Sequence, residues 1–340
     1  MNAAAKAFGI GVIGCGRIGR LHAELLARGV DGLHLAAVCD AVPQAAAVLG
    51  SELGIAVADS PAALLGRADV DAVAICSTTE SHVDLLVDVA AAGLPAFVEK
   101  PVSLSLREID RAIEAAERSG TAVQVGFNRR FDPSHRAVAD AVHAGDIGDL
   151  HLLRITSRDP APPPLEYLAG SGGIFADMTI HDFDMARFVS GAEVERVYAA
   201  GAVRLDAAFA EHSDWDTAVI VLTHADGTIT TIDNSREAVY GYDQRVEAFG
   251  SGGAMVSQNP HEHAAVRYRR EGVTAAPMPW FFTERYADAY RAEWRAFGEV
   301  VDGAPSPVTL ADGRACAVIA EAATRSARER RVVDVAELGI

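Results

Sequence analysis

The feature that most constrains this chain is a glycine pattern near its start. Residues 14–19 read Gly-Cys-Gly-Arg-Ile-Gly, directly after the apolar residues 8–13 and directly before a helix-like stretch at residues 20–26. In such a strand–turn–helix the first glycine permits the tight turn, the second lets a phosphate approach the backbone, and the third lets helix and strand pack closely. Amides at the helix N-terminus then hold the phosphates. The pattern predicts a nucleotide-binding turn made by Gly14, Gly16, Arg17, Ile18 and Gly19.

An acid at the end of a second apolar run indicates which nucleotide binds. Asp40 follows residues 33–39, about 20 residues beyond the last glycine, where a carboxylate accepts both hydroxyls of the adenosine ribose. A ribose phosphate would meet a like charge there, and residues 40–43 hold no Arg or Lys to neutralise it. We therefore expect NAD as the cofactor. The alternative is that Asp40 caps the helix that follows Pro43.

The charge balance argues against several classes of partner. The 340 residues include 47 acidic and 30 basic side chains, for a formal net charge of −17. Such a chain repels nucleic-acid backbones and anionic membranes, and its basic clusters at residues 129–130 and 325–331 are short. No apolar run approaches the ~18 to 20 residues that span a bilayer. The first six residues show no signal-peptide pattern. We expect a cytoplasmic protein that binds neither nucleic acid nor membrane.

The cysteines show no metal-binding pattern. Cys15, Cys39, Cys76 and Cys316 lack the CxxC spacing, and three of them fall at predicted strand ends near the cofactor turn, where we expect small buried side chains. The His-Glu-His sequence at residues 261–263 lies in a polar loop and does not make a ligand set by itself. We expect no metal.

The first 127 residues alternate between strand-like and helix-like periods. Short apolar runs at residues 72–76, 96–98 and 122–127 are typical of strands buried on both faces, and amphipathic stretches at residues 81–92 and 106–119 lie between them. The pattern predicts a Rossmann-type domain over residues 1–127, a doubly wound parallel sheet that binds NAD.

From about residue 151 the pattern changes. Alternating runs at residues 194–203, 216–223, 228–234, 245–249 and 264–269 follow one another without intervening helices, which indicates an antiparallel or mixed sheet. Helices are expected at residues 284–302 and 310–330, packed back on the first domain. The fold class is therefore α/β, with a C-terminal α+β domain over residues 128–340 that contains a large, mostly antiparallel open sheet.

A lysine stands where a ligand would lie. Glu99, Lys100 and Pro101 follow the strand at residues 96–98, and the carboxyl ends of such strands border the ligand crevice. Proline biases the residue before it toward extended backbone, which fixes the exit angle of Lys100. A cation there can orient a hydroxyl and stabilise negative charge as its proton leaves. The alternative is a surface lysine at a strand end.

The predicted second domain contains a carboxylate and an imidazole four residues apart. If residues 174–189 are helical, Asp177 and His181 share a face beside an apolar stripe. A carboxylate within reach of a partly buried imidazole fixes its tautomer and raises its basicity, which suits proton abstraction from an alcohol. A purely structural pair is the alternative. A metal bound by His181, Asp182 and Asp184 is less favoured, because successive helix positions point apart.

Taken together, these motifs resemble a known family. Residues 14–19, 99–101 and 126–132 and the Asp177/His181 pair occur in the order and spacing of the glucose–fructose oxidoreductase, inositol dehydrogenase and MocA family, over essentially the whole chain. Within it, residues 157–160 and 180–188 look most like NAD-dependent inositol 2-dehydrogenases.

The resemblance implies roles for individual residues. Lys100 and His181 would be the catalytic pair, with Asp177 supporting the histidine and binding substrate hydroxyls. The polyol pocket would be lined by Arg130, Asp159 and Tyr240, with Tyr242 as a nearby competitor for the last position. The cofactor would be bordered by Ser77, Thr78, Thr79, His82, Glu99 and Lys100. The resemblance also implies a homodimer or homotetramer formed through the sheet of the second domain.

The implied activity is hydride transfer from a ring carbon of a cyclitol to NAD, with myo-inositol oxidised to 2-keto-myo-inositol. Three alternatives stay open. The substrate of a related dehydrogenase could be scyllo-inositol, chiro-inositol or a pyranose. Some relatives use NAD transiently to hydrolyse glycosides without net redox change. The chain could also be a non-catalytic NAD sensor.

Overall fold

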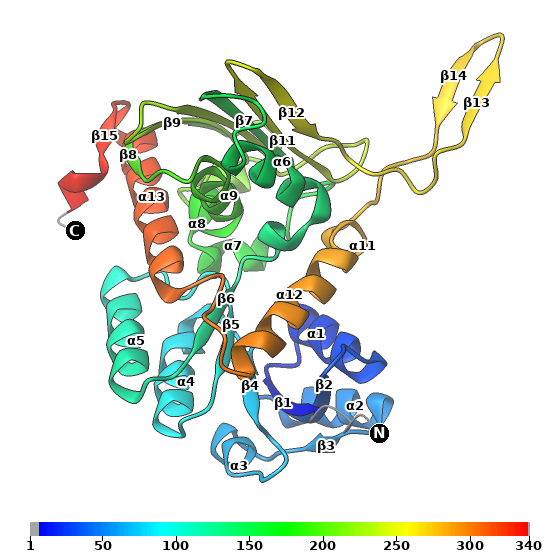
Figure 1. The fold of residues 1–340 in the computed structure, drawn as a ribbon, viewed down its shortest axis with the longest axis vertical. Coiled ribbons are helices and arrows are strands. Elements are labelled where there is room, and N and C mark those ends of the chain that lie inside the picture. Colours follow the sequence, from blue (N-terminus) through cyan, green and yellow to red (C-terminus); the bar gives the residue numbers. More distant parts are fainter. Residues whose placement is uncertain (1–6, 339–340) are drawn as a thin grey trace. The chain divides into compact units, whose positions relative to one another are not determined.

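The computed structural model describes residues 7–338, so the prediction made for the first six residues lies outside the described residues. The chain divides into two compact units (Figure 1). The first comprises Met1–Asn128 and Tyr290–Ala315, and the second comprises Arg129–Ala289 and Cys316–Ile340. The chain therefore leaves the first unit and returns to it late, within helix α12 (Ala287–Val301).

A six-stranded parallel sheet forms the centre of the first unit, in the order β3-β2-β1-β4-β5-β6. Its strands β4 and β5 are buried on both faces, because helices from the crossover connections cover the sheet. The predicted doubly wound sheet is confirmed. The elements are β1 (Phe8–Ile13), α1 (Arg17–Arg28), β2 (Leu33–Cys39), α2 (Pro43–Leu53), β3 (Ala56–Val57), α3 (Pro61–Leu65), β4 (Ala72–Ile75), α4 (Thr79–Ala91), β5 (Ala96–Glu99), α5 (Leu106–Ser119) and β6 (Val123–Gly126).

The second unit contains a seven-stranded mixed sheet, in the order β12-β11-β7-β10-β9-β8-β15. Only β10 and β7 pair in parallel, and the other neighbours are antiparallel, as predicted for this half of the chain. Its strands are β7 (Leu150–Arg158), β8 (Val194–Ala202), β9 (Thr217–His224), β10 (Ile229–Ser235), β11 (Asp243–Gly250), β12 (Gly253–Ser257) and β15 (Val333–Asp334).

One face of this sheet is covered by helices and the other is open. Buried and less buried side chains alternate along β9, β10 and β11, which is the pattern of a sheet packed on one side. Helices α6 (Pro133–His143) and α9 (Ile180–Ser190) pack on the covered face, and Val219 and Phe249 are exposed. The remaining helices that begin in this unit are α7 (Leu165–Ser171), α8 (Gly173–Asp177), α10 (Ala208–Glu211) and α11 (Phe282–Arg285), and α13 (Leu310–Glu329) runs from the first unit into the second.

Two predicted elements of this half need correction. The helix expected at residues 284–302 is two helices, α11 and α12, separated at Tyr286, whose φ of −110° and ψ of 20° depart from helical geometry. The strand expected at residues 264–269 does not join the sheet. It forms β13 (Val266–Arg269), which pairs only with β14 (Gly272–Ala275) in a hairpin that projects away from the sheet (Figure 1). All side chains of this hairpin are exposed, so no buried face fixes it to the sheet.

Among residues 7–338, no helix combines the length and the apolar character needed to cross a membrane.

Candidate active site

The glycine turn between β1 and α1 has the geometry that the sequence predicts. Gly14 adopts a φ of +100°, which side chains disfavour, and a Cβ on Gly19 would lie 1.9 Å from the carbonyl oxygen of Gly14. A Cβ on Gly16 would meet nothing within 4 Å. Gly16 is also the N-cap of α1, and no side chain caps the helix. Open space therefore lies directly at uncapped helix amides, which fits the pyrophosphate of a dinucleotide.

Asp40 follows β2 and reaches the same turn. Its Oδ2 accepts a hydrogen bond from the backbone N–H of Cys15 at 2.6 Å, and its Oδ1 accepts one from the N–H of Val42 at 2.7 Å. Val42 is the N-cap of α2, so Asp40 does not cap that helix and the capping alternative is wrong. The carboxylate instead lies beside the glycine turn, where a ribose would lie next to the phosphates.

The ends of β4 and β5 are tied together by His82. Its Nε2 lies 3.1 Å from the carbonyl oxygen of Ser77, just after β4, and its Nδ1 lies 2.9 Å from that of Pro101, just after β5. Burial lowers the pKa of His82. Thr78 is the N-cap of α4 and Thr79 its first residue. Two of the predicted cofactor residues thus form the start of one helix, and His82 links the segment before that start to the segment containing Lys100.

Lys100 lies directly beyond β5, half-buried, and its peptide bond to Pro101 is cis. Its backbone N–H donates to Oε2 of Glu99 at 3.1 Å. Glu99 is itself buried, and its Oε1 lies 2.8 Å from Nε2 of His22 on α1. The strand end that the sequence singles out is therefore held by side chains from another part of the unit.

The helix predicted through Asp177 and His181 is interrupted. Helix α8 ends at Asp177 and α9 begins at Ile180. The backbone N–H groups of Met178 and Thr179 both donate to the carbonyl oxygen of Ile174, which ends the regular i to i−4 pattern. The expectation of one continuous helix is wrong, because a turn separates the two residues.

Asp177 has partners that the sequence did not reveal. Its Oδ1 accepts from the hydroxyl of Tyr167 at 2.8 Å, and its Oδ2 accepts from Nη1 of Arg236 at 3.0 Å. Arg236 is almost fully buried at the end of β10. A charge-assisted hydrogen bond from a buried guanidinium fixes the orientation of the neighbouring carboxylate.

The start of α9, which carries His181, is anchored to the sheet by a set of side chains that we call the Arg129 network. Nη1 of Arg129 donates to Oδ1 of Asp182 at 2.6 Å and to Oγ of Ser157 on β7 at 2.8 Å. Nδ2 of Asn234 on β10 donates to the other oxygen of Asp182 at 2.8 Å, and its Oδ1 accepts from Thr179 at 2.6 Å. Since these bonds hold the residues on either side of His181, they fix the backbone from which the imidazole extends.

The three residues predicted to line the polyol pocket have different surroundings. Arg130 is buried and its guanidinium bonds to the carboxylate of Asp184. Asp159 follows β7, and its N–H donates to Ser235 at 2.9 Å. The phenol of Tyr240 is half exposed and bonds to Arg158 and Asp243.

Tyr242, the competitor for Tyr240, lies in a different environment. It is buried, and burial raises the pKa of its phenol well above the usual value. Arg129, Asp159 and Asp182 are close enough to act on that pKa electrostatically. The ring of Tyr242 meets that of Tyr286 edge-on at a centroid distance of 6.0 Å, and the guanidinium of Arg129 lies over the Tyr286 ring, 5.8 Å from its centroid.

Sequence reasoning missed Arg129, Asn234 and Arg236 as supporting residues. One signal was available for their acidic partners, because α9 carries Asp182 and Asp184 among apolar side chains, and a carboxylate buried in a helix needs a cation or several donors. The identity of those donors was not visible, since they come from other segments.

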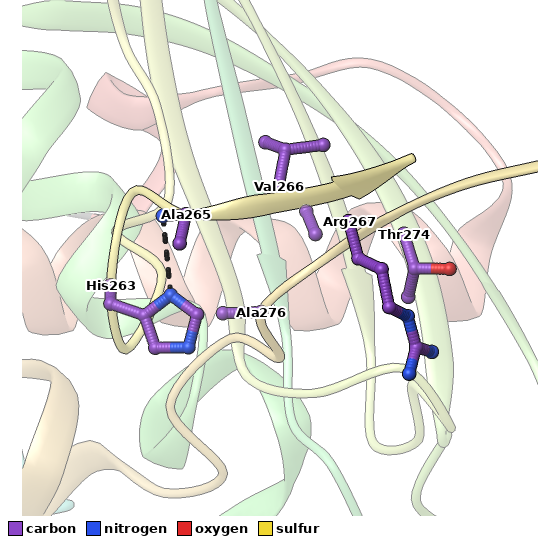
Figure 2. Close-up of a pocket in the computed structure, with 7 residues that line it drawn as sticks. His263, Ala265, Val266, Arg267, Thr274 and Ala276 are labelled. Atoms are coloured by element: carbon purple, nitrogen blue, oxygen red, sulfur yellow. Dashed lines mark hydrogen bonds between the residues drawn. The ribbon is translucent and has the colours of Figure 1, made fainter. Parts of the chain in front are cut away.

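A pocket elsewhere in the second unit is unrelated to these residues. It lies at the base of the β13–β14 hairpin and includes His263, Arg267 and Thr274 (Figure 2). His263 accepts a hydrogen bond at Nδ1 from the N–H of Ala265. Within the described range 7–338, no group of three or more His, Cys, Asp or Glu side chains is arranged to hold a metal. All four cysteines are buried and unbridged, and the burial predicted for the three at strand ends is confirmed.

Comparisons with known proteins agree with both units. A family model described as an oxidoreductase family with an NAD-binding Rossmann fold matches residues 8–127. A second model, described as the GFO/IDH/MocA C-terminal domain, matches residues 135–256.

Similar proteins cover nearly the whole chain. The myo-inositol 2-dehydrogenase of Thermotoga maritima is 45% identical over 97% of this chain and 99% of its own length. The inositol 2-dehydrogenase of Rhizobium meliloti is 41% identical over 96% of this chain and 98% of its own. A crystal structure of scyllo-inositol dehydrogenase from Lactobacillus casei, with bound cofactor NAD(H) and scyllo-inositol, is 30% identical, has a TM-score of 0.90, and covers 97% of this chain and 100% of that one. This chain belongs to the glucose–fructose oxidoreductase, inositol dehydrogenase and MocA family of oxidoreductases.

Proposed function

We propose that this protein is an NAD-dependent inositol 2-dehydrogenase that oxidises myo-inositol to 2-keto-myo-inositol. The observation that carries the proposal is the near full-length identity of 45% to a protein named myo-inositol 2-dehydrogenase. The site residues support it, because the open glycine turn fits a dinucleotide and the chain holds Lys100, Asp177 and His181 at the positions that the family resemblance implies.

The chemistry assigns one task to each of these residues. NAD, when bound, supplies the acceptor for the hydride that leaves the ring carbon. His181 accepts the proton of the hydroxyl on that carbon, and the ammonium of Lys100 donates a hydrogen bond to the oxygen as negative charge develops. Asp177, fixed by Tyr167 and Arg236, supports the histidine and binds substrate hydroxyls. The products are a ketone, NADH and a proton, so atoms and electrons balance.

The substrate offers only hydroxyl groups, so carboxylates and an arginine would recognise it better than an ion pair would. We propose that Arg130, Asp159 and Tyr240 make these contacts. Tyr242 competes with Tyr240, and its burial beside Arg129 and the electrostatic influence of Asp159 favour it. Around the cofactor we propose the residues of the glycine turn, Asp40, and the strand-end residues Ser77, Thr78, Thr79, His82 and Glu99.

The choice of lysine at position 100 supports a catalytic role. Of the chain's 30 basic residues 28 are arginines, and Lys100 is the only lysine among residues 7–338. Arginine presents a planar, rigid fork of donors, whereas a lysine amine is a compact charge with three rotatable donors. The residue after β5 is thus a lysine in a chain whose other basic side chains are almost all arginines, which supports a specific need for the amine at this position.

We further propose that residues 1–127 act as the NAD-binding domain and residues 128–340 as the substrate-binding and oligomerisation domain. The protein would act in the cytoplasm as a homodimer or homotetramer. Four unbridged cysteines support a reducing compartment, and the exposed face of the seven-stranded sheet supports self-association.

The test is NADH formation by the purified protein with myo-inositol, scyllo-inositol, chiro-inositol, glucose or xylose, repeated with NADP. Turnover of myo-inositol with NAD is expected. If only another member of the panel is turned over, the proposed substrate is wrong, but the proposed cofactor and catalytic residues stand. If no member is turned over, the dehydrogenase proposal is wrong and the glycosidase or sensor alternatives gain weight.

The kcat of single-residue variants tests whether the proposed residues carry the activity. Lys100→Ala and His181→Ala should each lower kcat by about 100-fold or more while NADH binding survives. The exposed His34→Ala is the matched control and should behave like the unmodified protein. Retained turnover in both site variants would exclude this catalytic pair.

A further inference from the structure

A chain of three buried side chains lies behind the strand end that carries Lys100. The indole Nε1 of Trp294 on α12 donates to Nδ1 of His22 at 2.9 Å. Nε2 of His22 lies 2.8 Å from Oε1 of Glu99, and the other oxygen of Glu99 accepts from the N–H of Lys100 at 3.1 Å. Trp294 and His22 are both 0% exposed.

The hydrogen bonds that join Trp294, His22 and Glu99 can run in only one direction, from the indole to the carboxylate. An indole N–H can donate but cannot accept, so Nδ1 of His22 must be the acceptor. The ring proton then lies on Nε2 and is donated to the carboxylate of Glu99. Trp294 therefore sets the tautomer of His22, and that tautomer makes His22 a donor to Glu99.

Packing prevents the carboxylate of Glu99 from turning elsewhere. A Cβ on Gly126 would lie 3.2 Å from both the carboxyl carbon and Oε2 of Glu99, so the neighbouring strand closes one side. Around His22 the rings of Phe97 and Tyr290 lie edge-on at centroid distances of 5.2 and 5.6 Å. Neither end of the chain has room to change partner without moving a buried ring or a strand.

Two clamps thus hold the backbone on either side of the lysine. The carboxylate of Glu99 holds the N–H of Lys100, and Nδ1 of His82 lies 2.9 Å from the carbonyl oxygen of Pro101. Misplacement of a catalytic group by about 1 Å can cost on the order of 100-fold in rate. The position of the ammonium depends on the backbone that these contacts fix.

We propose that Trp294 and His22 are positioning residues for Lys100, acting through Glu99. The inference rests on the proposed function, in which the ammonium of Lys100 stabilises the oxygen of the reacting alcohol. Neither residue touches substrate in this role, and both act on the rate of the chemical step rather than on binding.

The decisive variant is Trp294→Phe, which keeps an aromatic ring stacked on Phe97 and removes only the N–H donor. Its kcat should fall about tenfold, while KM for the polyol and Kd for NADH stay unchanged, because an interaction used in the chemical step has been weakened. The matched control is Phe297→Leu, at a buried ring that contacts Trp294 at a centroid distance of 5.6 Å. This control should lower Tm at least as much and leave kcat within about twofold.

A pair of substitutions at His22 provides the rescue. The amide of His22→Gln can accept from the indole and donate to Glu99, so it should keep most of kcat, whereas His22→Leu should not. A readout independent of activity is available because the sequence has two lysines, Lys6 and Lys100, so a Lys6→Arg background leaves Lys100 as the one lysine amine to be methylated. The NMR signal of its isotopically methylated amine should shift in Trp294→Phe and stay in place in Phe297→Leu.

Wild-type kcat in Trp294→Phe, or a loss of kcat that follows Tm equally in both ring variants, would overturn the inference. Failure of the proposed function is a different result, because the unmodified protein would then show no turnover with any polyol, and both claims would fall. Turnover by the unmodified protein with no effect of Trp294→Phe removes only the positioning role.

Discussion

The guanidinium of Arg130 forms a bidentate ion pair with the carboxylate of Asp184, through two of its nitrogens. Its Nε lies 2.9 Å from Oδ2, and its Nη2 lies 2.6 Å from Oδ1. Both residues are buried, and Arg130 also lies over the ring of Phe188, 5.3 Å from its centroid. This pair joins the segment that begins the second unit to α9, the helix that carries His181.

Removing one member of this pair should therefore destabilise the second unit strongly. Asp184→Ala leaves a buried guanidinium without its carboxylate, and breaking a buried pair in this way costs about 3–5 kcal/mol. Urea unfolding followed by circular dichroism measures the loss. Asp84→Ala is the control, since Asp84 pairs with Arg111 at an exposed position and should change stability little. Equal effects of the two substitutions would contradict this account.

Two glycines of the turn should separate folding from cofactor binding. Gly16→Ala adds a methyl group that meets no protein atom at a residue with an ordinary φ of −67°, so stability should be unchanged. NAD binding should weaken by about tenfold, or ~1.4 kcal/mol, because the methyl group occupies the space for the phosphates.

The matched variant is Gly19→Ala, whose methyl group would overlap the carbonyl oxygen of Gly14. It should destabilise the first unit by about 1–3 kcal/mol or more, as overpacking does. Thermal unfolding and NADH titration of both variants make the comparison. A stable Gly16→Ala variant with unchanged NAD affinity would show that the phosphates do not approach Gly16.

Asp40 should determine the preference for NAD. Asp40→Ser removes the charge that repels a ribose phosphate, so the ratio of kcat/KM with NADP to that with NAD should rise by at least about tenfold. The control is Asp69→Ser, which removes the same charge from an exposed pair with Arg67. An unchanged ratio in Asp40→Ser would place the ribose elsewhere.

His135 should make the second unit sensitive to acid. It is buried on α6 between Ser257 and Tyr286, and burial, assisted by Arg285 and Arg129, lowers its pKa to about 3 despite the nearby Asp132. The unfolded chain, with a histidine pKa near ~6.5, binds the proton more readily, so this contribution to stability is complete above that pH and is lost as the pH falls.

The loss should reach about 2 kcal/mol at pH ~5 and continue toward pH ~3. His135→Gln removes the titrating group, so its stability should fall less between these pH values than that of the unmodified protein. Unfolding midpoints measured across the range test this, with His34→Gln as the exposed control. Parallel pH profiles for His135→Gln and the unmodified protein would show that other groups dominate.

The elements predicted correctly from the sequence are those whose ends are marked by residues next to them in the chain. The strands Phe8–Ile13 and Leu33–Cys39 and the helix Leu106–Ser119 agree with the structure to the residue. Each is bounded by its own signals, such as the glycine turn after β1, or Ser105 and Gly120 at the two ends of α5.

The interruption of the helix before His181 was not predictable from period alone, because residues 174–189 keep a helical apolar pattern through the turn. The hydrogen-bond partners of the site residues were even harder to predict from the sequence. Trp294 lies 272 residues from His22, and Arg236 lies 59 residues from Asp177. Nothing in the local pattern around either partner indicates the contact, since both follow from how distant segments pack.

The late return of the chain to the first unit also bears on how the protein is made. Val308 provides the carbonyl that receives the N–H of Val125, and Trp294 and Glu293 bond to His22 and Gln124. All of these partners leave the ribosome after residues 129–289 have been added. At about 5–20 residues per second, the parallel sheet waits on the order of ten to thirty seconds for them. A newly made N-terminal segment must therefore stay unaggregated with the indole site of His22 unfilled, and a chain truncated before Tyr290 lacks the residues that complete its dinucleotide-binding unit.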